Sequence, residues 1–314
     1  AASQHRLIDY VILAFAKCGT TSMEQVLRHD SQAPPGDTCL SVGAAIKSSY
    51  ENWDSETPSR ANNNIMTGLK CPGGLHLDYA HSWGIVQPQS LMIVGIRHPI
   101  LSFESWYNMF VQNGWNFNDP YKLIPSCQDY ESCGHYGCPD DGVVCTDRLR
   151  YHVALAELGK TPLGDNETAN MSFHDWEHPK EVPSWYRTVP NKVFLYEVSQ
   201  MADPDLERRR QFWADLSHAP DFPHELRGQN KDPIKPGKKG LDPEVQKERN
   251  SRKIDICHDA YDDLRELLMK YAREVSDWIC QYFLESNDVI VSSRDTFCPE
   301  IMAKWKVDPC DTRT

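Results

Sequence analysis

The sequence predicts one α/β domain in which a central, mostly parallel sheet is flanked by helices. Three short apolar runs, at residues 10–15, 91–96 and 193–197, suit strands that are buried on both faces of such a sheet. A loop and a segment with helical patterning follow each run, and strands separated by helices imply parallel pairing with right-handed crossovers. No break in composition requires a second domain, so we expect residues 1–314 to fold as one unit.

The helices are predicted by apolar residues at helical spacing. Residues 22–28 show this spacing after the first strand, and residues 100–111 show it after the second. After the third strand, charged residues at 203–210 precede an apolar pattern at 212–216. The strongest prediction is a helix over residues 259–284, where eight apolar side chains recur near a helical period.

Long irregular stretches separate these elements. Residues 31–58 and 113–141 are rich in Pro, Gly, Asn, Asp and Cys, which is typical of loops. Loops of this length in a compact domain are usually functional or cross-linked, so we expect both to line a ligand cleft over the sheet. A third stretch, about residues 229–240, is a basic loop within an acidic protein.

Charge and hydropathy argue against two classes of protein. The chain carries 33 Lys and Arg residues against 45 Asp and Glu residues, a net charge of −12. This acidity disfavours a nucleic-acid binder that depends on a broad basic surface. No run approaches the roughly 18 consecutive apolar residues of a membrane span.

Cysteine content and glycosylation sequons indicate an oxidising compartment. Eleven cysteines in 314 residues are more than a reduced cytosolic protein usually carries. Asn166 and Asn170 begin two N-glycosylation sequons in a polar stretch. The chain opens at Ala1 without an initiator Met, as expected if a targeting or anchoring segment has been removed. We therefore expect the secretory lumen, in the Golgi or after secretion, with membrane contact only through such an N-terminal anchor.

One cluster of cysteines is open to two interpretations, a zinc site or disulfides. The cysteine spacings of six, five and seven residues lack the close pairs of structural zinc sites, so disulfides are favoured and their pairing stays open. The cluster consists of Cys127, Cys133, Cys138 and Cys145, with His135 among them. Cys18 lies apart from this cluster, and we expect it to remain a buried thiol outside any disulfide.

The most informative segment joins the first strand to the first helix. Gly19 allows a tight turn, while the Lys17 side chain, three hydroxyl groups and the first amides of the helix converge on one point. This convergence predicts an anion site. The ATPase phosphate loop would place its Lys after a second Gly, whereas Lys17 precedes the only Gly here, so that pattern fails. The hydroxyls belong to Thr20, Thr21 and Ser22.

A second constellation follows the second strand directly. Arg97 comes first, Pro99 begins a helix, and Ser105 and Tyr107 lie eight and ten residues after Arg97. An Arg at the carboxyl end of a strand and a Ser in the next helix can hold one phosphate together. The alternative is an Arg in a salt bridge at the sheet edge and a Ser that faces solvent.

Together these two segments resemble the sulfotransferase superfamily, whose donor is 3′-phosphoadenosine 5′-phosphosulfate. The resemblance implies a P-loop-like sulfotransferase fold, closest in character to luminal carbohydrate enzymes. In this family the first motif holds the 5′ phosphosulfate and the second holds the 3′ phosphate. It therefore implies donor binding by Lys17, Cys18, Gly19, Thr20, Thr21, Ser22, Arg97 and Ser105. No metal is implied, since no carboxylate that would anchor Mg²⁺ is evident.

Further matches assign residues by resemblance alone. Lys70 precedes Pro72, as in luminal members where this Lys lies beside the transferring sulfuryl group, and the strand at 193–197 resembles one that ends in Tyr-Glu. The basic segment Lys238, Lys239 and Gly240 resembles a late loop that closes over the 3′ phosphate. Two departures stand out: Cys39 occupies the region where luminal members often have a Glu, and no cysteines flank the late loop.

The expected chemistry is sulfuryl transfer to a hydroxyl or amine, in which Lys17 neutralises the bridging oxygen as the nucleotide leaves. Lys70 would act on the leaving group or position the acceptor. His76 is the first candidate for the general base, because imidazole suits proton removal near neutral pH. We expect a carbohydrate acceptor, with small molecules left open. The alternatives are a small-molecule kinase, which would need ATP and a metal, and a secreted binding protein without turnover.

Overall fold

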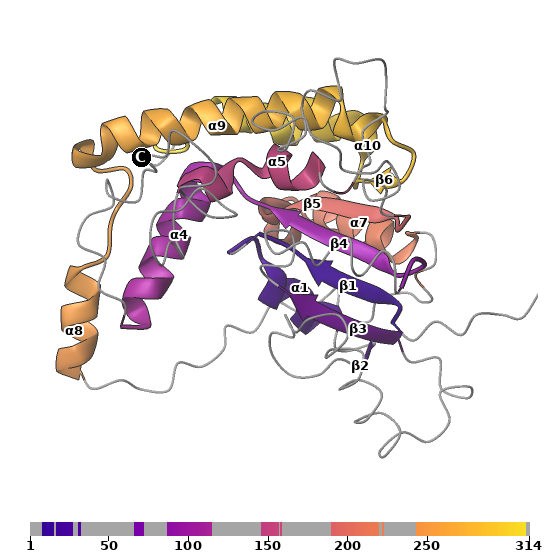
Figure 1. Cartoon of the computed structure of the whole chain (residues 1–314), viewed down its shortest axis with the longest axis horizontal. Helices are drawn as coiled ribbons and strands as arrows, with labels where there is room; N and C mark the ends of the chain where they lie inside the picture. Colours follow the sequence, from indigo (N-terminus) through magenta and orange to yellow (C-terminus); the bar gives the residue numbers. More distant parts are fainter. Residues whose placement is uncertain are drawn as a thin grey trace, which may run out of the picture.

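The computed structural model describes residues 8–15, 17–27, 31–32, 66–71, 87–114, 146–156, 158, 190–219, 222 and 243–311. Within these ranges the chain forms a six-stranded sheet of order β2-β3-β1-β4-β5-β6, and every strand pair is parallel (Figure 1). The predicted α/β class with a mostly parallel sheet is therefore confirmed. The strands are β1 (Tyr10–Leu13), β2 (Ser31–Gln32), β3 (Met66–Cys71), β4 (Leu91–Ile96), β5 (Val193–Glu197) and β6 (Val289–Ile290).

Helices cover both faces of this sheet. The α-helices are α1 (Thr20–Leu27), α4 (Pro99–Gln112), α5 (Tyr151–Ala156), α7 (Leu206–Ser217), α8 (Pro243–Ser251), α9 (Asp262–Gln281) and α10 (Arg294–Thr296). Short 3-10 segments are η4 (Thr146–Leu149), η7 (Val198–Ala202), η9 (Asp259–Tyr261), η10 (Phe283–Glu285) and η12 (Met302–Lys306), and η11 (Phe297–Ile301) is a π-helical turn.

The strands are continuous apolar runs because each contributes side chains to two cores. In β1, Val11 and Leu13 belong to the core formed with α4, α5 and α9, whereas Tyr10 and Ile12 belong to the core formed with α1 and α7. This alternation follows the two-residue period of a strand. Burial on both faces is typical of parallel sheets covered by helices.

The predicted helices are present with shifted boundaries. The first begins at Thr20, two residues before the predicted start, because the turn is complete at Gly19. The predicted helix at 259–284 is a composite, in which the 20-residue α9 is preceded by η9 and followed by η10. Its buried face packs on α4, α5 and η12 (Figure 1).

Two disulfides fasten the layer that contains α9. Cys257 pairs with Cys310 and Cys280 pairs with Cys298, which confirms the prediction of disulfide bonds. Cys71 at the end of β3 is also disulfide-bonded. The cysteine cluster at 127–145 lies outside the described residues, as do both sequons.

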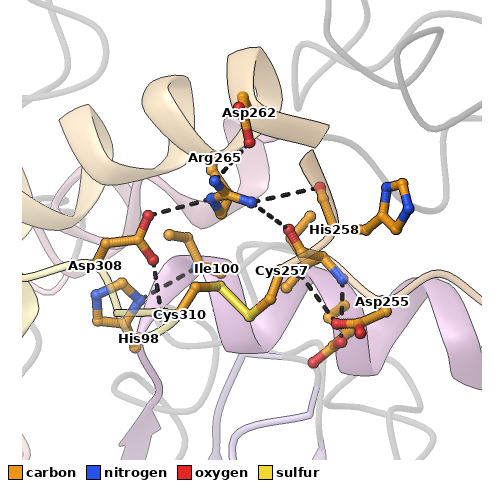
Figure 2. The surroundings of a disulfide bond; sticks show 11 residues. His98, Ile100, Asp255, Cys257, His258, Asp262, Arg265, Asp308 and Cys310 are labelled. Atoms are coloured by element: carbon orange, nitrogen blue, oxygen red, sulfur yellow. Dashed lines mark hydrogen bonds and ion pairs between the residues drawn. A yellow bond between two sulfur atoms is a disulfide. The ribbon is translucent and has the colours of Figure 1, made fainter. Parts of the chain in front are cut away.

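Figure 2 shows the surroundings of the Cys257–Cys310 disulfide. Arg265 donates from Nε to Asp308 Oδ2 at 3.2 Å and from Nη1 to the carbonyl of Ile256 at 3.1 Å. The backbone N–H of Cys310 donates to Asp308 Oδ1 at 2.8 Å. These contacts hold the segment after η12 against the start of α9. None of the helices within the described ranges has the length and apolar character needed to cross a membrane.

Candidate functional site

The order of the strands reverses direction between two neighbouring strands, β1 and β4. From β1 the chain continues to β2 and β3 on one side, and it then crosses to β4 on the other side of β1. The loops that follow β1 and β4 therefore leave in opposite directions. In open parallel sheets ligands bind at such a reversal, outside the carboxyl ends of the strands. Lys17 follows β1 at this point, and Arg97 follows β4.

The loop after β1 has an unusual backbone. Lys17 and Gly19 both adopt positive φ angles, 65° and 78°. A Cβ atom on Gly19 would lie 2.3 Å from Met201 Cε and 2.8 Å from Val198 Cγ2, so the loop also packs tightly on η7. Only glycine satisfies both constraints at this position. The left-handed conformation of Lys17 is uncommon for a residue with a side chain and is frequent at functional sites.

Helix α1 begins at this reversal, directly after the turn at Gly19. The amides of its first turn have no acceptor within the helix, because the intrahelical pattern begins only with the N–H of Met23, which donates to Gly19 O at 2.9 Å. Thr20 is buried, Thr21 is exposed and Ser22 is half-buried. The resulting positive end can bind an anion, which is the chemistry expected of this loop.

Arg97 brings the second motif to the first. Its Nη1 donates to the carbonyl oxygen of Lys17 at 3.5 Å, although 80 residues separate the two along the chain. Ser105 is half-buried on α4, and no hydrogen bond among the described residues joins it to Arg97 or to the loop. His98, between Arg97 and Pro99, caps α4 by accepting from Ile100 N at 3.3 Å.

A cluster of buried polar side chains contacts Cys18 and so supports the loop after β1. Cys18 Sγ lies 3.8 Å from Tyr151 Oη and 4.0 Å from Ser102 Oγ. Tyr196 Oη donates to the carbonyl oxygen of Cys18 at 2.9 Å. Gly95 makes room for this bond, since a Cβ there would lie 2.5 Å from both oxygens. Burial raises the pKa of the Cys18 thiol to about 12, so Cys18 is a buried, protonated thiol as the sequence predicted.

The carboxylate at the end of β5 lies beside the second motif. Glu197 is paired in register with Ile96, directly before Arg97. Burial raises the pKa of Glu197, while its bonds to Ser199 and the charge of Arg97 act in the opposite direction. Its carboxylate accepts from the backbone N–H of Ser199 at 2.8 Å, and its own N–H donates to Gln200 Oε1 at 2.9 Å. Glu197 thus shapes η7, the segment that packs on Gly19.

Lys70 reaches the same loop from β3. Its Nζ lies 2.6 Å from Glu24 Oε2 in an ion pair whose side chains are 7% and 5% exposed. The same Nζ donates to Thr21 Oγ1 at 3.5 Å, so the ammonium group lies beside the first turn of α1. The structure therefore gathers Lys17, Lys70 and Arg97 at one edge of the sheet.

Sequence reasoning missed three residues of this site. Ser102 and Tyr151 support Cys18, and Glu24 pairs with Lys70. Two of them carried a signal: Ser102 precedes Ser105 by one helical turn, and Glu24 lies among the apolar residues of its helix. Tyr151 carried no signal, because its position depends on tertiary packing.

The remaining candidates lie outside the described residues. These are His76 and the basic segment Lys238, Lys239 and Gly240, together with nearly all of the two long loops. Within the described ranges, no group of three or more His, Cys, Asp or Glu side chains is arranged to hold a metal ion.

Two of the surface hollows formed by the described residues lie beside α7. The larger, of about 490 Å³, is lined by residues of η7, α7 and the segment from Ser292 to Val307. The smaller, of about 400 Å³, surrounds Asp215 and His218. The residues gathered at the loop do not line either hollow, so these hollows are separate features of the surface.

Comparison with known proteins adds no family assignment. No model of a known protein family matches the chain, and no curated protein matches it significantly. The geometry of the loop, its three cations and the strand order are therefore the features that bear on function.

Proposed function

We propose that this protein is a sulfotransferase that moves a sulfuryl group from 3′-phosphoadenosine 5′-phosphosulfate to a hydroxyl group, with a carbohydrate as the expected acceptor. One observation carries the proposal: Lys17 and Arg97, from two motifs 80 residues apart, meet at the carboxyl edge where the strand order reverses. A donor with anionic groups at both ends matches two cationic motifs on neighbouring strands.

The residues around the loop fit such a donor. Arg97 contacts the backbone of Lys17, Lys70 lies beside the first turn of α1, and the Glu24 carboxylate there is paired with Lys70. The bound donor would supply an activated sulfuryl group on a phosphosulfate anhydride. Lys17 would stabilise the negative charge that grows on the departing phosphate oxygen. Arg97 would bind the phosphate that does not react and so fix the orientation of the nucleotide.

The disulfides support a secretory location for this reaction. Two bridges among the described residues fit a protein outside the reducing cytosol. We propose the Golgi lumen or the cell exterior as the site of action. In this compartment glycan hydroxyl groups are available as acceptors.

Ligand-induced stabilisation tests the donor. We expect 3′-phosphoadenosine 5′-phosphate to raise the melting temperature, with a gain of about 2.7 kcal/mol at a hundredfold excess over its dissociation constant. ATP with Mg²⁺ should stabilise much less, because it lacks a 3′ phosphate for Arg97. Equal or stronger stabilisation by ATP would favour the kinase alternative instead.

Turnover tests the reaction itself. Transfer of radiolabelled sulfate should be screened against a panel of glycans and small hydroxyl compounds, with and without a chelator. Arg97→Ala should mainly weaken donor binding, whereas Lys17→Ala should lower turnover more than affinity, because the charge that Lys17 stabilises grows in the transition state. Nucleotide binding without transfer to any acceptor would favour a binding protein.

A further inference from the structure

The ion pair between Glu24 and Lys70 is unusual in its burial. Lys70 is on β3 and Glu24 is on α1, and their charged atoms lie 2.6 Å apart with both side chains at most 7% exposed. Most ion pairs among the described residues have an exposed partner; Arg210 and Glu207, for example, are 58% and 82% exposed. The Glu24–Lys70 pair is therefore a feature of the interior, at the edge of the candidate site.

Stability alone gives little reason for such a pair. Removing two charges from water costs as much as their attraction returns, so an apolar pair of similar volume is often equally stable or more stable. A buried ammonium group without a carboxylate would tend to lose its proton. Glu24 therefore makes a permanent positive charge possible at the position of Lys70.

The groups around the Lys70 ammonium indicate what its charge can do. Lys70 Nζ also donates to Thr21 Oγ1 at 3.5 Å, and Thr21 is exposed in the first turn of α1. The ammonium group is thus held between a buried carboxylate and the amino-terminal end of α1, a kind of helix end that can bind an anion. An anion at this turn would meet the helix amides, the Thr21 hydroxyl and the Lys70 charge together.

We propose that Glu24 is a positioning residue: it keeps Lys70 charged and aimed at the first turn of α1, where the reacting sulfuryl group would lie. This inference rests on the proposed function. Glu24 itself acts through Lys70, and Lys70 stabilises the charge that the transition state develops. The inference predicts that Glu24 affects the chemical step more than it affects the binding of either substrate.

Four variants test this role through kcat, KM and stability. Glu24→Gln preserves shape and removes the charge, and we expect it to lower kcat by roughly tenfold or more, with the acceptor KM within about twofold of wild type. Glu24→Asp keeps the charge and should recover part of the loss. Lys70→Met should lower kcat at least as much. Glu207→Gln, at an exposed pair on α7, is the matched control and should behave as wild type.

The double variant Glu24→Gln/Lys70→Met separates positioning from folding. It lacks both charges of this buried pair, so its urea midpoint should recover relative to Glu24→Gln, while kcat should stay low. A kcat for Glu24→Gln equal to that of wild type, measured per folded molecule, would overturn the inference. So would recovery of kcat in the double variant. Failure of the proposed function looks different: the wild-type protein would neither be stabilised by 3′-phosphoadenosine 5′-phosphate nor transfer sulfate, and the inference would then fall with it.

Discussion

The Cys257–Cys310 disulfide should contribute more to stability than the Cys280–Cys298 disulfide, because it closes the longer loop. The two bridges span 53 and 18 residues. Limiting the freedom of the unfolded chain in loops of these lengths corresponds to about 4 kcal/mol for the longer and about 3 kcal/mol for the shorter. Both values are large beside the roughly 5–15 kcal/mol that stabilises a typical domain.

Native contacts around the Cys257–Cys310 disulfide should hold the folded structure in place when this disulfide is removed. Asp308 bonds to Arg265 and to the Cys310 amide, and the rings of Trp305 and His98 lie 5.8 Å apart. We expect these contacts to persist when the sulfurs are replaced, so the folded state should retain its structure and the loss should arise in the unfolded chain. The difference in stability lost between the two disulfides should therefore depend on loop length and not on local packing.

The assay is urea unfolding followed by circular dichroism. Cys257→Ser/Cys310→Ser is compared with Cys280→Ser/Cys298→Ser, since replacing both partners leaves no reactive thiol behind. We expect free energies of unfolding reduced by about 4 and about 3 kcal/mol respectively. A loss below about 1 kcal/mol for the longer bridge, or a larger loss for the shorter bridge, would refute this reasoning.

Three further predictions concern the loop and its surroundings. Gly19→Ala should destabilise the protein by about 1–3 kcal/mol in urea unfolding and weaken nucleotide binding, since φ is 78° there and η7 blocks a Cβ; unchanged values would mean that the loop can shift. Burial lowers the pKa of His98 from 6.5 to about 4, so the unfolded chain binds a proton in this window that the folded protein does not, and stability should fall as pH decreases from about 6.5 to about 4. His98→Asn keeps a side-chain cap without titrating and should flatten that slope, whereas an equal slope would assign it to other groups. The Cys18 thiol should resist alkylation at pH 8 in the native protein and react in urea, because burial raises its pKa to about 12; rapid native labelling would contradict this.

The fold was predictable where the sequence pattern was simple. β1, β4 and β5 are unbroken apolar runs, and each one was predicted as a strand. β3 was not, because Thr67, Gly68 and Lys70 interrupt its apolar character. The reason is visible in the packing: a Cβ at Gly68 would lie 1.9 Å from the Tyr10 ring, so this strand gives up a side chain to admit that ring. β6 has only two residues and carried too short a pattern to identify.

Only those residues of the candidate site that follow the ends of strands could be predicted from the sequence. Lys17 lies shortly after β1 and Arg97 directly follows β4, and parallel strands bring their carboxyl ends to one edge, so the proximity of these residues could be expected from the chain alone. The contacts that hold this edge could not. Ser102, Tyr151 and Glu24 act through partners that are distant in sequence, and those distances depend on how the helices pack on the sheet.

The order of the disulfide cysteines along the chain has a consequence for biosynthesis. The strands that carry the three cations are complete by residue 97, but the Cys257–Cys310 bridge joins residues that leave the ribosome much later. Trp305, which lies against His98 beside Arg97, arrives within the loop that this bridge closes. During synthesis, the core that the early strands share with α9 therefore stays uncovered until the C-terminal helices dock. The Cys257–Cys310 bond can form only after residue 310 has been synthesised, so oxidation of this pair comes late in the assembly of the fold.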